Sequence, residues 1–132
     1  MATIDDLRES LREFVRERDW EQFHDPKNLA TGLSIEASEL LELFLWTRTE
    51  DAHAQGHKES ERVAEELGDV MLYCIMLGDS LGIDPVAAAA AKLQKNRRKY
   101  PVHLAKGNAE KYSRLHGGET PPELDVPSGR GE

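Results

Sequence analysis

Two helix-length segments, residues 29–46 and 59–81, are apolar around most of their circumference, and this limits the folds open to the chain. A helix that is apolar on all sides must be buried on all sides. A chain of 132 residues has too little other material to cover two such helices within one monomer. We therefore expect an all-α fold that assembles as a homo-oligomer.

Helical periodicity and end signals predict two further helices, over residues 3–17 and 84–100, which makes a four-helix bundle. Thr3 and Asn28 are the expected N-caps of the first two helices, and Gly82 follows the end of the third. Residues 19–27 break the helical period and contain a proline, so we expect a loop there. Residues 1–115 form the predicted domain, and the Gly- and Pro-rich residues 116–132 are predicted to be a disordered tail.

The composition favours a soluble cytoplasmic protein. The single cysteine excludes a disulfide framework and a Cys-rich zinc site. The first residues lack the basic and apolar regions of a secretory signal. The longest apolar run, Val70–Leu77, has 8 residues, whereas a membrane span needs about 20. We expect no membrane partner.

The net charge of −8 is distributed unevenly along the chain. Residues 1–91 carry 20 acidic and 8 basic side chains, and residues 92–114 carry 8 basic and 1 acidic. The acidic body would repel a nucleic acid backbone, so we expect no nucleic acid partner. The basic segment could contact a smaller anion, or it could be an ordinary solvated helix end.

Paired carboxylates interrupt both apolar helices. Glu36 and Glu39 lie three residues apart on one face, and Glu66 and Asp69 repeat that spacing. Either these pairs face solvent as charged surfaces, or a cation holds them together, because buried like charges repel and lose hydration. Carboxylate oxygens without a histidine or cysteine suit a hard divalent cation, Mg²⁺ first and Mn²⁺ next.

The basic segment supplies possible partners for an anion that such a cation binds. Lys92, Asn96 and Lys99 recur at spacings of three and four residues and therefore share one helix face. Mg²⁺ commonly accompanies phosphate substrates, and lysine side chains neutralise phosphate oxygens. The two patterns together predict a polyphosphate site.

The spacing Glu36-x-x-Glu39, 26 residues, Glu66-x-x-Asp69 resembles the metal motif of the MazG-like, all-α nucleoside triphosphate pyrophosphohydrolases. The resemblance covers residues 3–115 and is strongest toward the family members that act on dCTP. It also rests on three further blocks: Arg18-Asp19-Trp20-Glu21-Gln22-Phe23-His24, Glu42-Leu43-Phe44-x-Trp46 and Asn96-Arg97-x-x-Tyr100-Pro101-Val102-His103-Leu104.

The resemblance implies Mg²⁺-dependent cleavage of dCTP or a modified dCTP to the nucleoside monophosphate and pyrophosphate, in a tetramer of paired dimers. It assigns the metal to Glu36, Glu39, Glu66 and Asp69, with Glu36 and Glu39 as candidates for orienting the attacking water. It also assigns substrate contacts to six residues: the base to Trp20 and Trp46, the sugar to Tyr73, and the phosphates to Lys92, Asn96 and Lys99.

Two departures from the family pattern bear on specificity. Leu11 stands where the resembled proteins have a histidine associated with base contact, and Lys99 stands where they have an arginine. Lysine cannot bind phosphate in the bidentate manner of arginine. The alternative to an enzyme is a non-catalytic helical oligomerisation or nucleotide-sensing module that keeps the carboxylates for metal-linked stability.

Overall fold

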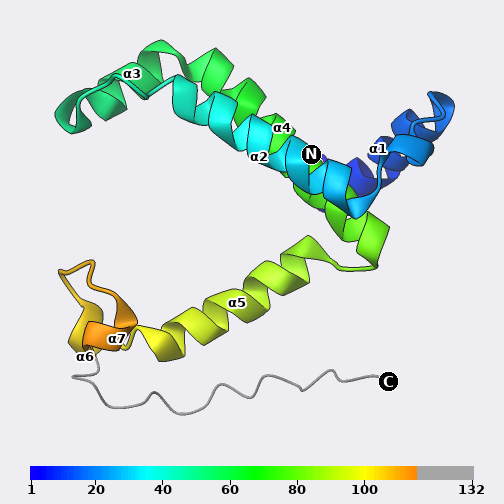
Figure 1. Ribbon diagram of the computed structural model, residues 1–132. Coiled ribbons are helices and arrows are strands. Elements are labelled where there is room, and N and C mark those ends of the chain that lie inside the picture. Colours follow the sequence, from blue (N-terminus) through cyan, green and yellow to red (C-terminus); the bar gives the residue numbers. More distant parts are fainter. Residues whose placement is uncertain (116–132) are drawn as a thin grey trace. The chain divides into compact units, whose positions relative to one another are not determined.

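The computed structural model describes residues 1–115, and these residues form helices without any strand (Figure 1). The predicted tail, residues 116–132, lies outside the described residues. The described part contains seven α-helices and two 3₁₀-helices: α1 Ile4–Glu17, η1 Glu21–Phe23, α2 Pro26–Glu42, η2 Thr49–Asp51, α3 Ala52–Lys58, α4 Ser60–Leu81, α5 Pro85–Lys99, α6 Val102–Ala105 and α7 Tyr112–Leu115.

The four predicted helices correspond to α1, α2, α4 and α5, but the described residues hold more helices than four. Helix α3 lies between the second and third predicted helices, where no helix was expected, and η1 lies in the predicted loop. Helix α2 ends at Glu42, four residues before the predicted end, because the backbone tightens into turns: the Phe44 N–H donates to the Leu41 carbonyl at 2.9 Å. Apolar residues therefore continue past the helix itself.

Capping side chains fix where the long helices begin and end. Thr3 caps α1 as predicted, in a reciprocal arrangement with Asp6. The predicted cap Asn28 is wrong for α2: the Asp25 carboxylate accepts from the Asn28 N–H at 2.9 Å and caps the helix instead. Gly82 ends α4 in the left-handed region at φ 66°, where a side chain would be strained.

Helices α2 and α4 form an antiparallel hairpin that organises residues 1–85 (Figure 1). Leu29 and Leu43 of this hairpin are buried, as is Ile75 on α4, and α1 contributes Val15. Because the helices run antiparallel, residues at the start of α2 lie beside residues near the end of α4, and the middles of the two helices face each other.

Large apolar side chains remain exposed on the same unit. Trp46 is 93% exposed, and seven large apolar residues of α2, the following turn and α4 are at least 45% exposed: Ile35, Leu41, Leu45, Trp46, Leu67, Met71 and Leu81. An apolar surface of this kind is typical of a face that another protein covers. It agrees with the excess of apolar surface that the sequence predicted.

The second compact unit begins at Val86 and holds most of α5 together with α6 and α7. No residue of α5 is buried. Within the described residues, no single helix is long and apolar enough to cross a membrane by itself. The extent of the domain, residues 1–115, stays a prediction.

Candidate active site

Three predicted metal ligands meet between α2 and α4. Carboxylate oxygens of Glu36, Glu39 and Glu66 all lie within 4.8 Å of one another. The spacing of three residues puts the first two on one face of α2, and the antiparallel hairpin brings α4 against that face. The described residues thus gather carboxylates that lie 30 positions apart in the sequence.

Asp69, the fourth predicted ligand, lies one turn along α4 from Glu66 and outside this group of three. Its negative charge still contributes to raising the pKa values of Glu36 and Glu66. Asp69 therefore lies at the edge of the carboxylate cluster, which we define as Glu36, Glu39, Glu66 and Asp69.

The cluster is electrostatically unfavourable without a cation. Loss of hydration raises the pKa of Glu36 above its ordinary value, and the charges of Glu39 and Asp69 raise it further. Loss of hydration is also the largest cause that raises the pKa of Glu66, and the charge of Glu39 is the second largest. Among the described residues no lysine or arginine forms an ion pair with any member of the cluster.

The donor set fits a hard divalent cation. All of the cluster's donors are carboxylate oxygens, the ligands that Mg²⁺ prefers. Two oxygens on opposite sides of Mg²⁺ lie about 4 Å apart, so small rotamer changes would suffice for these carboxylates to share one ion. A cation would also offset the repulsion that raises the two pKa values.

Tyr73 packs across the hairpin next to the cluster. It is half-buried on α4, two turns after Glu66, and its ring lies on Gly32, one turn before Glu36 on α2. A Cβ atom on Gly32 would lie 2.3 Å from the Tyr73 ring. The absence of a side chain at position 32 is therefore what lets the tyrosine ring lie across α2.

The two predicted base-contacting tryptophans are far apart within one chain. Trp20 precedes α2 and Trp46 follows it, and the 17 residues of α2 span about 25 Å. Trp20 is 43% exposed and packs edge-to-face on Phe14, with ring centroids 5.7 Å apart. One chain therefore cannot place both tryptophans on the same base.

A cavity of about 210 Å³ lies between α1, η1 and the α2–α4 hairpin. Its apolar lining comes from α1, α2 and α4: Leu11, Val15, Leu29, Ile75 and Met76. Leu29 lies seven residues before Glu36 on α2, so this cavity, which we call the α1 cavity, begins about 10 Å along the helix from the carboxylate cluster.

Of the polar groups on the rim of the α1 cavity, His24 belongs to a block that the sequence pointed to, whereas the others were not singled out. Arg8, Arg12, His24 and Asp79 line it, and the ring of His24 lies 6.4 Å from that of Trp20. The available signal was the spacing of Arg8 and Arg12, one turn apart and on the same side of α1 as Leu11 and Val15. That spacing resembles any charged helix edge, so it carried no prediction.

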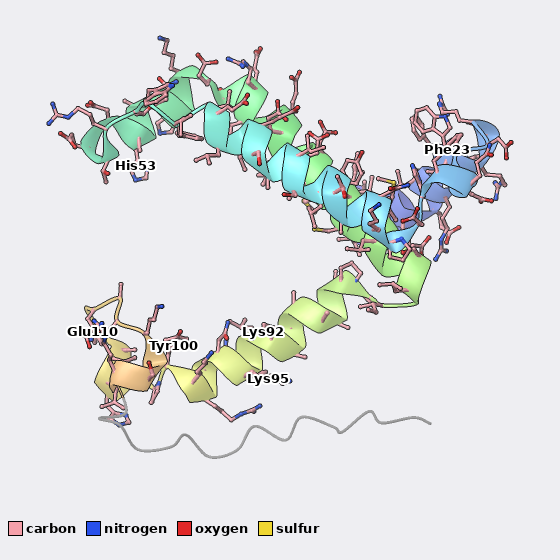
Figure 2. The ribbon with its side chains drawn as sticks, viewed as in Figure 1. Phe23, His53, Lys92, Lys95, Tyr100 and Glu110 are labelled. Atoms are coloured by element: carbon pink, nitrogen blue, oxygen red, sulfur yellow. The ribbon has the colours of Figure 1, made fainter. Side chains whose placement is uncertain are left out.

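The three predicted phosphate contacts lie on α5, in the second unit. Lys92 is exposed, while Asn96 and Lys99 are half-buried. Figure 2 shows Lys92 and Lys95 on this helix. Their spacing puts Lys92, Asn96 and Lys99 on one face, as predicted, and their role in binding phosphate stays a prediction.

Comparisons with known proteins give these features a context. A sequence model of the MazG-like family matches residues 32–115. The chain is 44% identical over 120 residues to dCTP pyrophosphatase 1 of Bos taurus, which covers 89% of this chain and 71% of that protein. It is also 44% identical over 118 residues to dCTP pyrophosphatase 1 of Homo sapiens, covering 87% of this chain and 69% of that protein.

A solved structure supports the same relationship. The crystal structure of a pyrophosphatase from Archaeoglobus fulgidus DSM 4304 matches with a TM-score of 0.73 and 41% sequence identity, covering 76% of this chain and 94% of that one. The matched residues 32–115 include every member of the carboxylate cluster. The chain described here is a member of the MazG-like family.

Proposed function

We propose that this protein hydrolyses dCTP or a modified dCTP to the nucleoside monophosphate and pyrophosphate with the help of Mg²⁺. The protein is an enzyme of the nucleoside triphosphate pyrophosphohydrolase class, in keeping with relatives named dCTP pyrophosphatase. The observation that carries the proposal is the carboxylate cluster, in which Glu36, Glu39 and Glu66 converge without a basic ion-pair partner in the part of the chain that the structure describes. A site of this kind recruits a divalent cation and, through it, a polyphosphate.

The four carboxylates would hold the cation between α2 and α4, with Mn²⁺ as a substitute for Mg²⁺. When bound, the ion would neutralise phosphate oxygens and make a coordinated water more acidic. Glu39, the more exposed of the two cluster glutamates on α2, would orient the attacking water and accept its proton at a carboxylate oxygen. The water oxygen bonds to the α-phosphorus, and the bond from the α-phosphorus to the oxygen that bridges the α- and β-phosphates breaks. That bridging oxygen leaves with pyrophosphate.

The base would enter the α1 cavity. That cavity is lined by Leu11, which occupies the position associated with base contact, and it lies on the same hairpin as the carboxylate cluster. Tyr73 would lie beside the sugar, and Trp20, next to His24, would flank the base. Lys92, Asn96 and Lys99 would contact the phosphates.

We further propose a homotetramer of paired dimers in which a second copy supplies Trp46 to each pocket. The exposed apolar residues of α2 and α4 offer a surface for a second copy, and Trp46 lies too far from Trp20 to serve the same pocket within one chain. In this arrangement each base would be flanked by Trp20 of one copy and Trp46 of another.

Incubation with a panel of nucleoside triphosphates and Mg²⁺ tests the proposal. We expect a monophosphate and pyrophosphate, with dCTP or a 5-substituted dCTP giving the highest kcat/KM. Glu39→Gln and Asp69→Asn are expected to lose turnover while keeping the helical signal and the oligomer. Release of orthophosphate, or a wild type that Mg²⁺ stabilises without turnover, would refute the proposal; the second result would indicate a non-catalytic module.

A further inference from the structure

Helix α1 packs on its unit through an apolar stripe that is mostly half-buried, at Ile4, Leu7 and Leu11. Val15 is its only buried residue, and Phe14, which lies beside it, is 42% exposed. Such partial burial stabilises the docking of a helix less than a fully buried face would. Because α1 forms one wall of the α1 cavity, the position of that wall depends on whatever else fixes the helix.

Two ion pairs contribute to that fixation: Arg8 of α1 with Asp84 at 3.6 Å, and Arg12 of α1 with Asp79 of α4, which has the closer, two-point geometry. The Arg12 guanidinium donates from Nε to Asp79 Oδ2 at 2.7 Å and from Nη2 to Asp79 Oδ1 at 2.5 Å. Its third nitrogen, Nη1, donates to Glu9 on α1 itself. Two parallel hydrogen bonds fix both the distance and the orientation between the two helices, which a single contact does not.

The chain after α1 follows the helix as a connected piece. Asp19 adopts φ 54°, in the left-handed region, and the Trp20 N–H then donates back to the Val15 carbonyl at 3.1 Å. The Gln22 side-chain amide donates to the Asp19 carbonyl at 2.9 Å and closes the turn. A displacement of α1 would therefore also move Trp20 and the start of η1.

We infer that Arg12 is a positioning residue, which holds α1 against Asp79 of α4 and so sets the wall of the α1 cavity that carries Leu11 and Val15, together with the segment after α1 that holds Trp20 and His24. The inference rests on the proposed function, because it assigns the base of the nucleotide to this cavity. Arg12 itself touches no reacting atom: the carboxylate cluster lies about two helical turns away along the hairpin.

Substitution of Arg12 should change substrate binding and leave the chemical step intact. For Arg12→Ala we expect KM for the nucleotide to rise about tenfold, the size of effect that follows from losing a charge-assisted contact, with kcat changed less than twofold. The Mg²⁺ concentration that gives half-maximal activity should stay the same. Arg12→Lys keeps the charge but loses the two-point geometry, so its KM should lie between that of the wild type and that of Arg12→Ala.

Arg16→Ala is the matched control, because Arg16 lies one turn along α1, is exposed and has no ion pair among the described residues. It should leave KM unchanged. The reversed pair Arg12→Asp with Asp79→Arg should recover part of the lost affinity. An unchanged KM in Arg12→Ala and Arg12→Lys, or a fall in kcat as large as the rise in KM, would overturn the inference.

A second measurement does not depend on turnover. In a Trp46→Phe background, Trp20 is the remaining tryptophan, and its quenching by acrylamide reports whether the segment that follows α1 stays in place. We expect Arg12→Ala to increase the quenching constant and Arg16→Ala to leave it unchanged. Increased quenching in a protein that hydrolyses no nucleotide would refute the proposed function alone, whereas unchanged quenching in Arg12→Ala would refute the positioning role.

Discussion

Glu39 acts on both of its neighbours in the carboxylate cluster. Its negative charge is among the causes that raise the pKa values of Glu36 and Glu66. A carboxyl with a raised pKa in the folded state holds its proton more tightly when folded than when unfolded. The free energy of unfolding is therefore highest below the ordinary pKa and falls as the pH rises through the raised value.

We predict opposite pH trends for the metal-free and the Mg²⁺-bound protein. Without a divalent cation, Tm should fall as the pH rises from about 4 toward neutrality, because Glu36 and Glu66 become ionised. With Mg²⁺ present, the stabilisation should grow over the same range, because the ion binds only the ionised carboxylates. Thermal melts at several pH values, with EDTA and with Mg²⁺, measure both trends.

Glu39→Gln sharpens this test. Removing its charge should raise Tm of the metal-free protein near neutral pH and reduce the increase that Mg²⁺ produces. Glu42→Gln, three residues further along α2 and outside the group of three converging carboxylates, is the control. Equal effects of the two substitutions would contradict a shared cation site.

Gly32 allows a second prediction at this scale. Gly32→Ala would place a Cβ 2.3 Å from the Tyr73 ring, so we expect a loss of about 1–3 kcal/mol from overpacking, together with a weaker affinity for the nucleotide. Gly68→Ala on α4 meets nothing within 4 Å and should be neutral or stabilise by up to about 1 kcal/mol. Urea unfolding and KM measurements compare the two variants, and equal losses would disprove the role of Tyr73 packing.

At the scale of elements, α1 depends on a titratable contact with α4. The hydrogen bonds from Arg12 lower the pKa of Asp79 below its ordinary value, partly opposed by loss of hydration. A carboxyl with a lowered pKa stabilises the folded state above the ordinary pKa, and this stabilisation is lost as the pH falls through the lowered value. The contribution of Asp79 to the free energy of unfolding therefore falls as the pH falls, whereas the contributions of Glu36 and Glu66 fall as the pH rises.

We therefore predict that α1 loosens in acid before the hairpin unfolds. Amide hydrogen exchange in α1 should accelerate as the pH falls below about 4, after correction for the intrinsic rate, while exchange in α2 and α4 stays slow. In Asp79→Asn, α1 should exchange rapidly at neutral pH as well. An α1 equally protected in that variant and in the wild type would contradict this account.

The elements also show what the sequence could predict. Helical periodicity and capping residues located α1, α2, α4 and α5, because those signals act over a few neighbouring residues. The short helix α3 and the Asp25 cap were missed: α3 is too short for an apolar period, and Asp25 and Asn28 are equally good capping residues in isolation. The Arg12–Asp79 pair joins positions 67 residues apart, which no local pattern reveals.

In the candidate site, too, the sequence predicted the features that depend on neighbouring residues and missed those that depend on distant contacts. The spacing within each helix predicted which carboxylates share a face, and the hairpin brings three of the four together. The α1 cavity depends on how α1 packs across the hairpin, so its polar lining could not be read from the chain. The roles of Lys92, Asn96 and Lys99 remain predictions from their spacing and from the family pattern.

At the scale of the whole molecule, the exposed apolar residues predict the state of association. Light scattering of the wild type should give a homo-oligomer at micromolar concentration. Leu67→Lys combined with Met71→Lys, one turn apart on α4 and half-exposed, should dissociate it and reduce activity, because each pocket would lose the partner's Trp46. Glu61→Lys on the same helix is the control for added charge, and a wild-type monomer would refute the assembly.

The distance between the tryptophans has a consequence for mixtures of chains. In a two-fold pair, each pocket would take Trp20 from one copy and Trp46 from the other, since α2 keeps the two about 25 Å apart within a chain. A hybrid of a Trp20→Ala chain with a Trp46→Ala chain would then hold one pocket with both tryptophans and one with neither. Two variants that are each inactive alone would complement each other, and a defect in one copy of the protein could be masked by a different defect in another.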